Sequence, residues 1–321
     1  MSCDFKADAD NLADLVAQIS DRLDADLYLY GGDITTDGYR MVCNLLEQTH
    51  DETGRRNAAL FLNTYGGDAH AAYRMARAFG HHYGKLTLFV FGYCKSAGTL
   101  LALGFNHIVI DDSGELGPMD VQMASRDEMF EYNSGLDMIQ AMDFLQRHAR
   151  MTFHEFLHDI RFKTRLGTKP AGEIARQITE RVFSGIYGQL DPVRLGYVQR
   201  TMSITRAYGE RLAARSKALR SREALDALVY NYPSHDFVID RAEARDRIFM
   251  DKVVRAPEKD EQFLGRVLYN LYPAEQKDVE FIFLTKALRP EPDALEPPAE
   301  KPPLDDDAPH AVTTPDIAVQ Q

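Results

Sequence analysis

Two short segments, about thirty residues apart, carry the residue types that acyl transfer requires. Leu60 to Asp68 reads LFLNTYGGD, and Phe89 to Thr99 reads FVFGYCKSAGT. Each is an apolar run of strand type that breaks into glycine and then enters a helix. A serine at such a turn, here Ser96, can be an exposed nucleophile, and backbone N–H groups of a Gly-Gly turn can bind an oxyanion. The pair of turns therefore predicts a site for attack on a carbonyl carbon.

The donors for the oxyanion follow from where the next helix begins. That helix is expected to start at Ala97, and the N–H groups of a first helical turn have no acceptor within the helix. The Ala97 N–H is therefore one expected donor. The Gly67 N–H is the second if the two strands are parallel neighbours, because their carboxyl ends then meet at one edge of the sheet. Serine is also a common helix N-cap, so the pattern alone leaves both roles of Ser96 open.

The elements that must position these turns alternate in type along the first third of the chain. Helical periodicity is expected at 11–23, 39–48 and 69–82 and from 97, and apolar strands at 26–30, 58–62, 86–91 and 108–110. This alternation predicts an α/β fold of repeated βαβ units with a mainly parallel sheet. Residues 134–230 are nearly all helical in pattern, which predicts a large helical C-terminal part.

Composition divides the chain into four parts. We expect an N-terminal helix at 1–25, the main domain at 26–255 and a small apolar extension at 256–288. From Arg289 onward the chain holds eight of its fourteen prolines and the run Asp305 to Asp307. Such a segment buries too little apolar surface to order itself, so 289–321 is predicted to be a disordered acidic tail. It would serve as a solubilising linker or recruit a protein partner.

Bulk composition excludes several classes of protein. The net charge of −12 leaves no excess of lysine and arginine to neutralise nucleic-acid phosphates. The three cysteines, Cys3, Cys43 and Cys94, are scattered and odd in number, which favours a reducing compartment and a cytoplasmic protein over a disulfide framework. The first residues lack a secretory signal pattern, and no apolar run is long enough to span a membrane.

Several linked motifs carry a resemblance to a known family. They are, in chain order, Asn63–Asp68, Cys94–Leu103, Gly114–Gln122, Gln189–Pro192 and Tyr232–Asp240. Together they resemble the Clp-fold serine proteinases, most nearly the serine dehydrogenase proteinase family, which is related to signal peptide peptidase A and more distantly to the Clp protease subunit and the crotonases. The resemblance covers residues 26–255.

The resemblance implies a ClpP/crotonase-like core, a homo-oligomer and hydrolysis of polypeptide substrates without a cofactor. It also implies that Ser96 is the nucleophile and that the N–H groups of Gly67 and Ala97 hold the oxyanion. A catalytically inactive assembly or binding subunit with the same fold is the alternative. Crotonase-type chemistry on acyl-coenzyme A is less favoured, because Ser96 has no role in it.

The resemblance identifies the nucleophile and the oxyanion donors, but it does not identify the general base by a matching motif. Clp protease subunits place a histidine on the strand after the nucleophile helix, where this chain has Gly117 to Asp120. Signal peptide peptidase A uses a lysine beyond that strand, and Lys163 is the nearest candidate; a solvated helix residue is the other interpretation. His235 is the alternative base, or else a loop histidine beside the Pro233 turn. Lys95 adjoins Ser96, but neighbouring residues on a strand point apart.

A rival motif points to metal chemistry. His154, Glu155 and His158 fit the pattern H-E-x-x-H, in which two histidines on one helix face bind zinc and the glutamate is the base. Glu180 is a candidate third ligand for such a zinc hydrolase. The apolar neighbours of the motif fit an ordinary amphipathic helix equally well, and this reading is favoured, so no metal site is predicted. Cys94 is expected to be an inert small residue.

Overall fold

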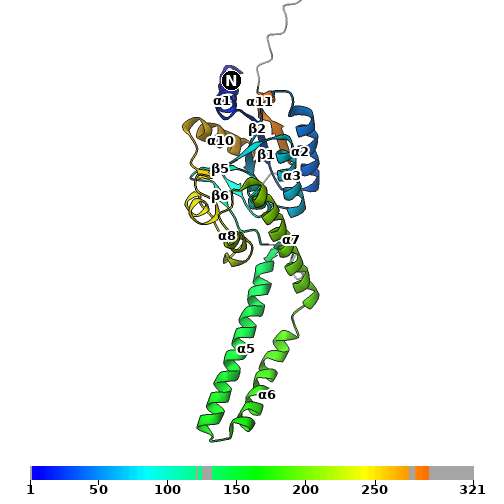
Figure 1. Ribbon diagram of the computed structural model, residues 1–321, viewed down its shortest axis with the longest axis vertical. Coiled ribbons are helices and arrows are strands. Elements are labelled where there is room, and N and C mark those ends of the chain that lie inside the picture. The colour runs from blue at the N-terminus through cyan, green and yellow to red at the C-terminus, as the bar shows by residue number, and fades with distance from the viewer. Residues whose placement is uncertain (1, 121, 125–131, 275–278, 289–321) are drawn as a thin grey trace, which may run out of the picture. The chain divides into compact units, whose positions relative to one another are not determined.

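Figure 1 shows the computed structural model of the chain, which describes residues 2–120, 122–124, 132–274 and 279–288. Residues 1–289 form one compact unit. The predicted disordered tail at 289–321 lies outside the described residues. None of the described helices combines the length and apolar content needed to cross a bilayer.

The unit is built on a six-stranded sheet with the order β10-β1-β2-β3-β5-β9. The strands from β1 to β9 in this order run parallel, and β10 pairs antiparallel with β1. Their bounds are Ala25–Gly31 for β1, Asn57–Asn63 for β2, Lys85–Val90 for β3, His107–Ile110 for β5, Val254–Arg255 for β9 and Glu280–Phe283 for β10. The predicted α/β class with a parallel-rich sheet is confirmed.

The central strands are buried on both faces, as their unbroken apolar runs require. Leu60 and Leu88 join one core, and Phe61 and Phe89 join the other. This division follows from the two-residue period of a strand. The first core is covered by α2 (Thr36–Thr49), α3 (Ala69–His82) and α4 (Ala97–Ala102), and the second by α1 (Ser2–Leu23), α10 (Lys259–Leu271) and α11 (Leu284–Ala287). In Figure 1, α2 and α3 lie on one side of the strands and α10 on the other.

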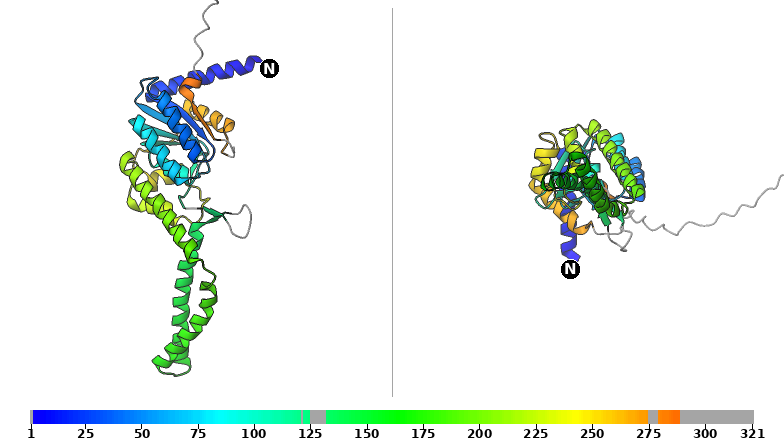
Figure 2. Two further views of the ribbon diagram at one scale, coloured as in Figure 1. Left: turned by 90° about the vertical axis from the view of Figure 1, so that its right-hand side faces the viewer. Right: turned by 90° about the horizontal axis from the view of Figure 1, so that it is seen from below.

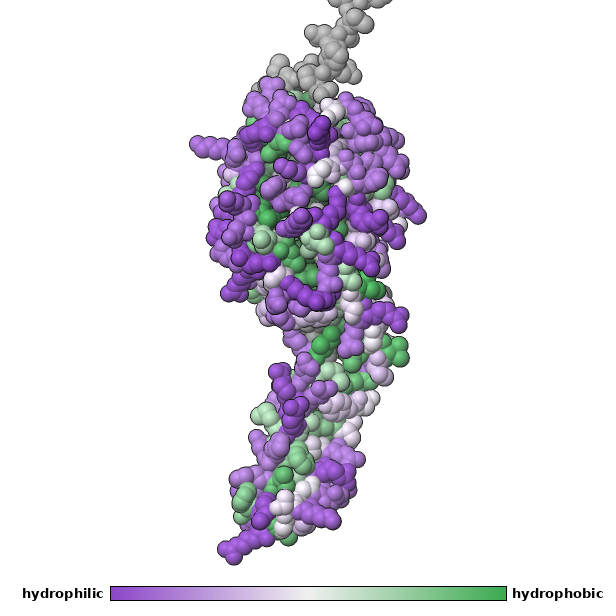
Figure 3. All heavy atoms as spheres, viewed as in Figure 1, coloured by the Kyte–Doolittle hydropathy of each residue, from purple (hydrophilic) through white to green (hydrophobic). Residues whose placement is uncertain are grey.

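The predicted helical part consists mainly of three long helices, α5 (Gly135–Lys163), α6 (Thr168–Tyr187) and α7 (Pro192–Ser216). Helices α5 and α6 pack along each other as an antiparallel hairpin (Figure 2). Several large apolar side chains of this hairpin are exposed, and hydrophobic residues, coloured green, are visible on its surface in Figure 3. Helix α7 then returns to the sheet and packs against α3 and α4, and its side chains Val198, Met202 and Leu212 are buried.

The start of α7 is specified locally. Asp191 is the N-cap, and its carboxylate accepts hydrogen bonds from the N–H groups of Val193 and Arg194. Pro192 occupies the first helical position, where a missing N–H costs no hydrogen bond. The motif Gln189–Pro192 is therefore the signal that ends the hairpin and begins the helix that reaches the site described below.

A buried carboxylate joins the N-terminal and C-terminal segments of the unit. Glu261 on α10 is fully buried, and its carboxylate accepts two hydrogen bonds of 2.7 Å from Arg255, one of 3.1 Å from Arg22 and one of 2.8 Å from the Glu258 N–H. Burial alone would raise the pKa of this carboxyl, but the hydrogen bonds from Arg255 and Glu258 outweigh burial and lower the pKa below its usual range.

We expect Glu261→Gln to lower the free energy of unfolding by about 3 kcal/mol at pH 7, because it removes the buried anion with which Arg255 and Arg22 pair. A carboxyl with a lowered pKa stabilises the fold above its unfolded pKa and loses this contribution as the pH falls through the folded pKa. Urea denaturation should therefore show the difference from the wild type shrinking toward pH 3. The matched control is Glu173→Gln, whose exposed pair with Arg176 should leave the free energy of unfolding nearly unchanged. A pH-independent difference would contradict the assignment.

Candidate active site

Ser96 occupies a strained turn between a short strand and a helix. The strand β4 (Tyr93–Cys94) precedes it, and α4 begins at the next residue. Ser96 has φ = 50° and ψ = −111°, a conformation with positive φ that residues other than glycine seldom adopt. Its side chain makes no N-cap hydrogen bond, although it stands at the N-cap position. The capping role that the sequence left open is therefore not the one that the geometry supports.

The Gly-Gly turn lies directly against Ser96. Gly66 and Gly67 both have positive φ, 122° and 130°. A Cβ atom on Gly66 would lie 2.8 Å from the Cβ of Ser96, and one on Gly67 would lie 2.2 Å from the carbonyl oxygen of Ile34. Ile34 fixes the turn through its N–H, which donates to Gly66 at 2.7 Å, and its carbonyl, which accepts from Asp68 at 2.8 Å. Glycine is thus required here by both conformation and space.

Backbone hydrogen bonds hold the two turns side by side. The Thr64 N–H donates to the Tyr93 carbonyl at 2.8 Å, and the Lys95 N–H donates to the Thr64 carbonyl at 3.1 Å. The N–H groups of Gly67 and Ala97 donate no hydrogen bond within the described part of the chain. Both residues line the same cavity as Ser96. The turns therefore present two donors next to a hydroxyl, as stabilisation of an oxyanion requires.

The cavity around Ser96 has a volume of about 460 Å³. Five separate parts of the chain form it, namely the Gly-Gly turn, the Ser96 turn, the segment after β6 (Glu115–Leu116), the surface of α7 and the loop near residue 235. The lining residues are Tyr65, Gly67, Asp68, Ala69, His70, Ser96, Ala97, Met119, Asp120, Tyr197, Arg200, Thr201, Ile204, Thr205 and His235.

His235 reaches this cavity from more than a hundred residues further along the chain and pairs there with Asp120. Its Nδ1 lies 2.8 Å from Oδ1 of Asp120, which is 2 % exposed. The loop that carries His235 is fixed by two hydrogen bonds between Leu116 and Ile239, of 2.9 and 3.0 Å. The structure thus brings a serine, a histidine and a carboxylate to one cavity.

Lys163, the other candidate base from the sequence, lies elsewhere. It is the last residue of α5, a helix about 43 Å long, and it does not line the Ser96 cavity. Its exposed ammonium pairs with Asp159 at 2.6 Å on the same helix face. The helix continues without a break past the point where the chain leaves the sheet, which carries Lys163 away. The solvated interpretation fits it better than a role as base.

The structure also shows a carboxylate that the sequence analysis did not single out. Asp120 ends the motif Gly117–Asp120, where Clp protease subunits have a histidine and this chain has a carboxylate that pairs with one. No spacing rule connects residues 120 and 235, so the pairing emerges only in the folded chain. Lys95 is 7 % exposed, and its ammonium lies 2.8 Å from Glu115 instead of facing the cavity. Cys94 is fully buried, and burial raises the pKa of its thiol, which makes it a poor nucleophile.

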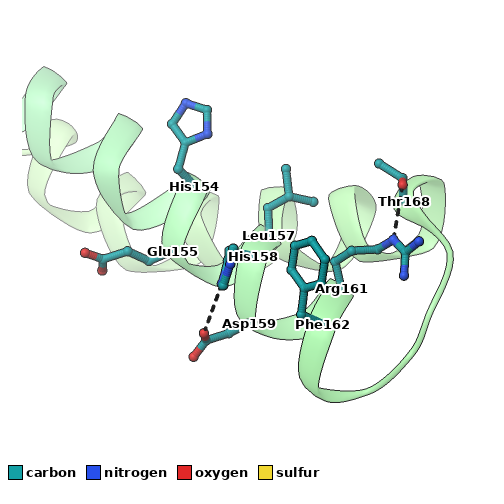
Figure 4. Close-up of a pocket in the computed structure, with 8 residues that line it drawn as sticks. All are labelled: His154, Glu155, Leu157, His158, Asp159, Arg161, Phe162 and Thr168. Carbon is teal, nitrogen blue, oxygen red and sulfur yellow. Dashed lines mark hydrogen bonds and ion pairs between the residues drawn. The ribbon is translucent and has the colours of Figure 1, made fainter.

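The residues of the H-E-x-x-H motif lie on α5 beside a separate cavity of about 950 Å³ (Figure 4). Figure 4 shows His158 turned toward Asp159, while the ring of His154 points away from it. Glu180, the proposed third ligand, pairs instead with Arg176 at 2.9 Å. Across the described ranges no three metal-ligating side chains gather, whereas a catalytic zinc needs three protein ligands. The zinc alternative does not fit this geometry.

Comparison with curated proteins finds two relatives in Methanocaldococcus jannaschii, both described as uncharacterized. MJ1495 is 29% identical over 136 residues, which are 40% of this chain and 46% of the relative. MJ0137 is 26% identical over 129 residues, which are 38% of this chain and 45% of the relative. The chain therefore spans under half the length of the curated relatives that it matches.

Among solved structures, the chain is similar to two mutant forms of a protein titled 1510-N membrane-bound stomatin-specific protease. A mutant in which alanine replaces a serine is 16% identical, with a TM-score of 0.29, and the similarity covers 46% of this chain and 69% of that one. A mutant in which alanine replaces a lysine, in complex with a substrate peptide, is 13% identical, with a TM-score of 0.39 and coverage of 76% and 98%.

The sequence of residues 49–190 matches the model of one protein family, described as ClpP-like SDH-type serine proteinase. This range contains the Gly-Gly turn, Ser96, Ala97 and Asp120, while His235 lies beyond it. The match agrees with the resemblance seen in the sequence and with the parallel-rich sheet. Residues 49–190 of this chain are therefore similar to the ClpP-like SDH-type serine proteinases.

Proposed function

We propose that this protein is a serine peptidase in which Ser96 is the nucleophile, His235 the general base and Asp120 the residue that orients the histidine. The single observation that carries the proposal is the cavity that Ser96 shares with His235 and with the N–H donors of Gly67 and Ala97. The substrate class is polypeptide, as for the family that residues 49–190 match.

The arrangement supports a two-step acyl transfer. With the Nδ1–H of His235 donated to Asp120, the free Nε2 accepts the proton of Ser96 as its Oγ bonds to the peptide carbonyl carbon. The carbonyl oxygen becomes an oxyanion held by the Gly67 and Ala97 N–H groups. The tetrahedral intermediate expels the amine, which takes the proton from His235, and water then hydrolyses the acyl-enzyme by the reverse sequence of proton transfers.

His235 is favoured over Lys163 by position. His235 is half-buried at the cavity and held by a buried carboxylate, whereas Lys163 is 73% exposed and paired with Asp159. A base must come within hydrogen-bond reach of the proton that it removes, and a residue outside the cavity does not meet that condition.

We further propose that the protein is a cytoplasmic homo-oligomer, for which the exposed apolar side chains of the α5–α6 hairpin provide contact surface. We assign the segment 289–321 a role as a linker or in the recruitment of a protein partner.

Ser96→Ala should abolish covalent labelling by a fluorophosphonate probe, because the probe reacts with an activated serine hydroxyl. Labelling is measured by intact-protein mass spectrometry and by mapping of the modified peptide. Persistent labelling of Ser96→Ala, or modification at another serine of the wild type, would reject the assignment. A wild type that is never labelled and cleaves no unfolded substrate would favour the inactive-subunit alternative.

The two candidate bases can be separated by a pair of variants. His235→Ala should slow labelling of Ser96 by roughly 10²- to 10⁴-fold, the range that a general base contributes. Lys163→Ala should leave the rate unchanged, because its ammonium faces Asp159 and solvent. His70→Ala is a matched control within the cavity, since His70 bonds to the Tyr208 hydroxyl at 2.9 Å. A slow Lys163→Ala with a normal His235→Ala would reverse the choice of base.

Gly66→Ala should suppress labelling by crowding the nucleophile, because its new Cβ would meet the Ser96 Cβ at 2.8 Å. The positive φ adds a strain of roughly 1–2 kcal/mol, which thermal unfolding would register. Gly54→Ala is the control, since Gly54 also has positive φ but nothing lies within 4 Å of its Cβ position. Gly54→Ala should lose similar stability and keep the wild-type labelling rate. Equal labelling of both variants would contradict the close approach.

A further inference from the structure

We infer that Lys95, the neighbour of the nucleophile in the sequence, is a positioning residue that fixes the His235 loop relative to Ser96. The inference rests on the proposed function and adds to it a residue that neither faces the cavity nor touches the substrate. The side chain of Lys95 runs from the turn of Ser96 to the loop of His235.

Lys95 is held at both ends of its backbone. Its N–H donates to the Thr64 carbonyl at 3.1 Å, and its carbonyl accepts from the Gly98 N–H at 2.7 Å. The first bond ties it to the Gly-Gly turn and the second to the first turn of α4. These two backbone hydrogen bonds therefore fix the position of Lys95 independently of its side-chain contacts.

The side chain of Lys95 runs away from Ser96 and across Gly117. A Cβ atom on Gly117 would lie 2.6 Å from Cδ of Lys95, so the passage of the aliphatic stem requires glycine there. The ammonium then reaches Oε1 of Glu115 at 2.8 Å and the carbonyl oxygen of Phe237 at 3.4 Å. The side chain of Lys95 is 9% exposed and that of Glu115 is 19% exposed, so this ion pair is largely removed from water.

The hydrogen bond from Lys95 to the Phe237 carbonyl connects Lys95 to the loop that carries His235. The Phe237 N–H donates to the Ser234 carbonyl at 3.3 Å, which closes a turn with His235 inside it. One end of the turn is therefore bonded to Lys95, and the imidazole is bonded to Asp120. Lys95 lies in the Ser96 turn, and its ammonium group thus links this turn to β6 and to the His235 loop.

Replacing Lys95 by methionine keeps the stem but removes the ammonium. Glu115 then keeps a shielded carboxylate without its cation, and the Phe237 carbonyl loses a donor. The loop retains its Leu116–Ile239 bridge, so it remains in place but loses its second anchor. A small displacement of a base from its reacting proton lowers rate much more than substrate affinity.

The test is a double-mutant cycle on the labelling rate of Ser96 by a fluorophosphonate. Lys95→Met should slow the reaction roughly tenfold to a hundredfold in the wild-type background. In the His235→Ala background it should change the rate by less than about twofold, because the group that it positions is absent. An equal fold-change in both backgrounds, or no change in either, would overturn the inference.

A second readout does not depend on activity. Hydrogen exchange of the backbone amides in residues 234–239, followed by mass spectrometry, should be at least about tenfold faster in Lys95→Met than in the wild type. The control is Lys85→Met, an exposed lysine at the start of β3, which should leave both exchange and labelling unchanged. Unchanged exchange in Lys95→Met would overturn the positioning role. Absence of wild-type labelling would count against the proposed function instead, and the exchange result would still decide the positioning role.

If Lys95→Met does not fold, Glu115→Gln serves in both measurements, because it removes the charge that holds the ammonium and keeps the side-chain volume. It should shift exchange and labelling in the same direction by a smaller factor. A folded Glu115→Gln protein with wild-type behaviour in both measurements would equally overturn the inference.

Discussion

The arrangement of the site depends on the contact between two backbone turns at the carboxyl ends of β2 and β3. These strands are parallel neighbours, so the turns that follow them emerge at the same sheet edge. The contact at Gly66 and Ser96 is so close that a single Cβ would disturb it. Everything else that the proposed chemistry needs is placed against this pair, including the N–H donors, the cavity and the base loop. The strained φ of Ser96 is the local cost of aiming its side chain outward from the turn.

Long-range contacts then decide which polar groups surround that pair. β6 places Glu115 beside Lys95 and leads into Asp120, while the Leu116–Ile239 bridge brings the His235 loop across. The N-cap at Asp191 starts a helix whose later turns form another wall of the cavity. Lys95, the His235–Asp120 pair and the Leu116–Ile239 bridge therefore connect segments that are separated by more than a hundred residues.

The sequence predicts the parts of this molecule that local patterns determine. The strands around Leu60 and Leu88 and the helices after Gly67 and Ser96 follow from apolar periodicity and from the turn residues. The proposed nucleophile and the proposed oxyanion donors follow from the same turns together with the family resemblance. The His235–Asp120 pair could not be predicted, because no periodicity relates residues that meet only through the fold. Proximity along the chain points to Lys163 as a base, but an uninterrupted helix carries this residue away from the cavity. The H-E-x-x-H spacing correctly indicates two histidines on one helix, but a third ligand depends on tertiary packing.

The separation of the site residues along the chain has a consequence for biosynthesis. During translation, Gly67, Ser96 and Asp120 leave the ribosome well before His235, at a rate of roughly 5–20 residues per second. For several seconds the nascent chain carries the proposed nucleophile without the histidine that we propose as its base. The order of the genetic message thus delays the onset of reactivity until the long helices and the loop behind them have been made. In the proposed mechanism, a nascent chain therefore lacks its own complete site until the His235 loop has been synthesised.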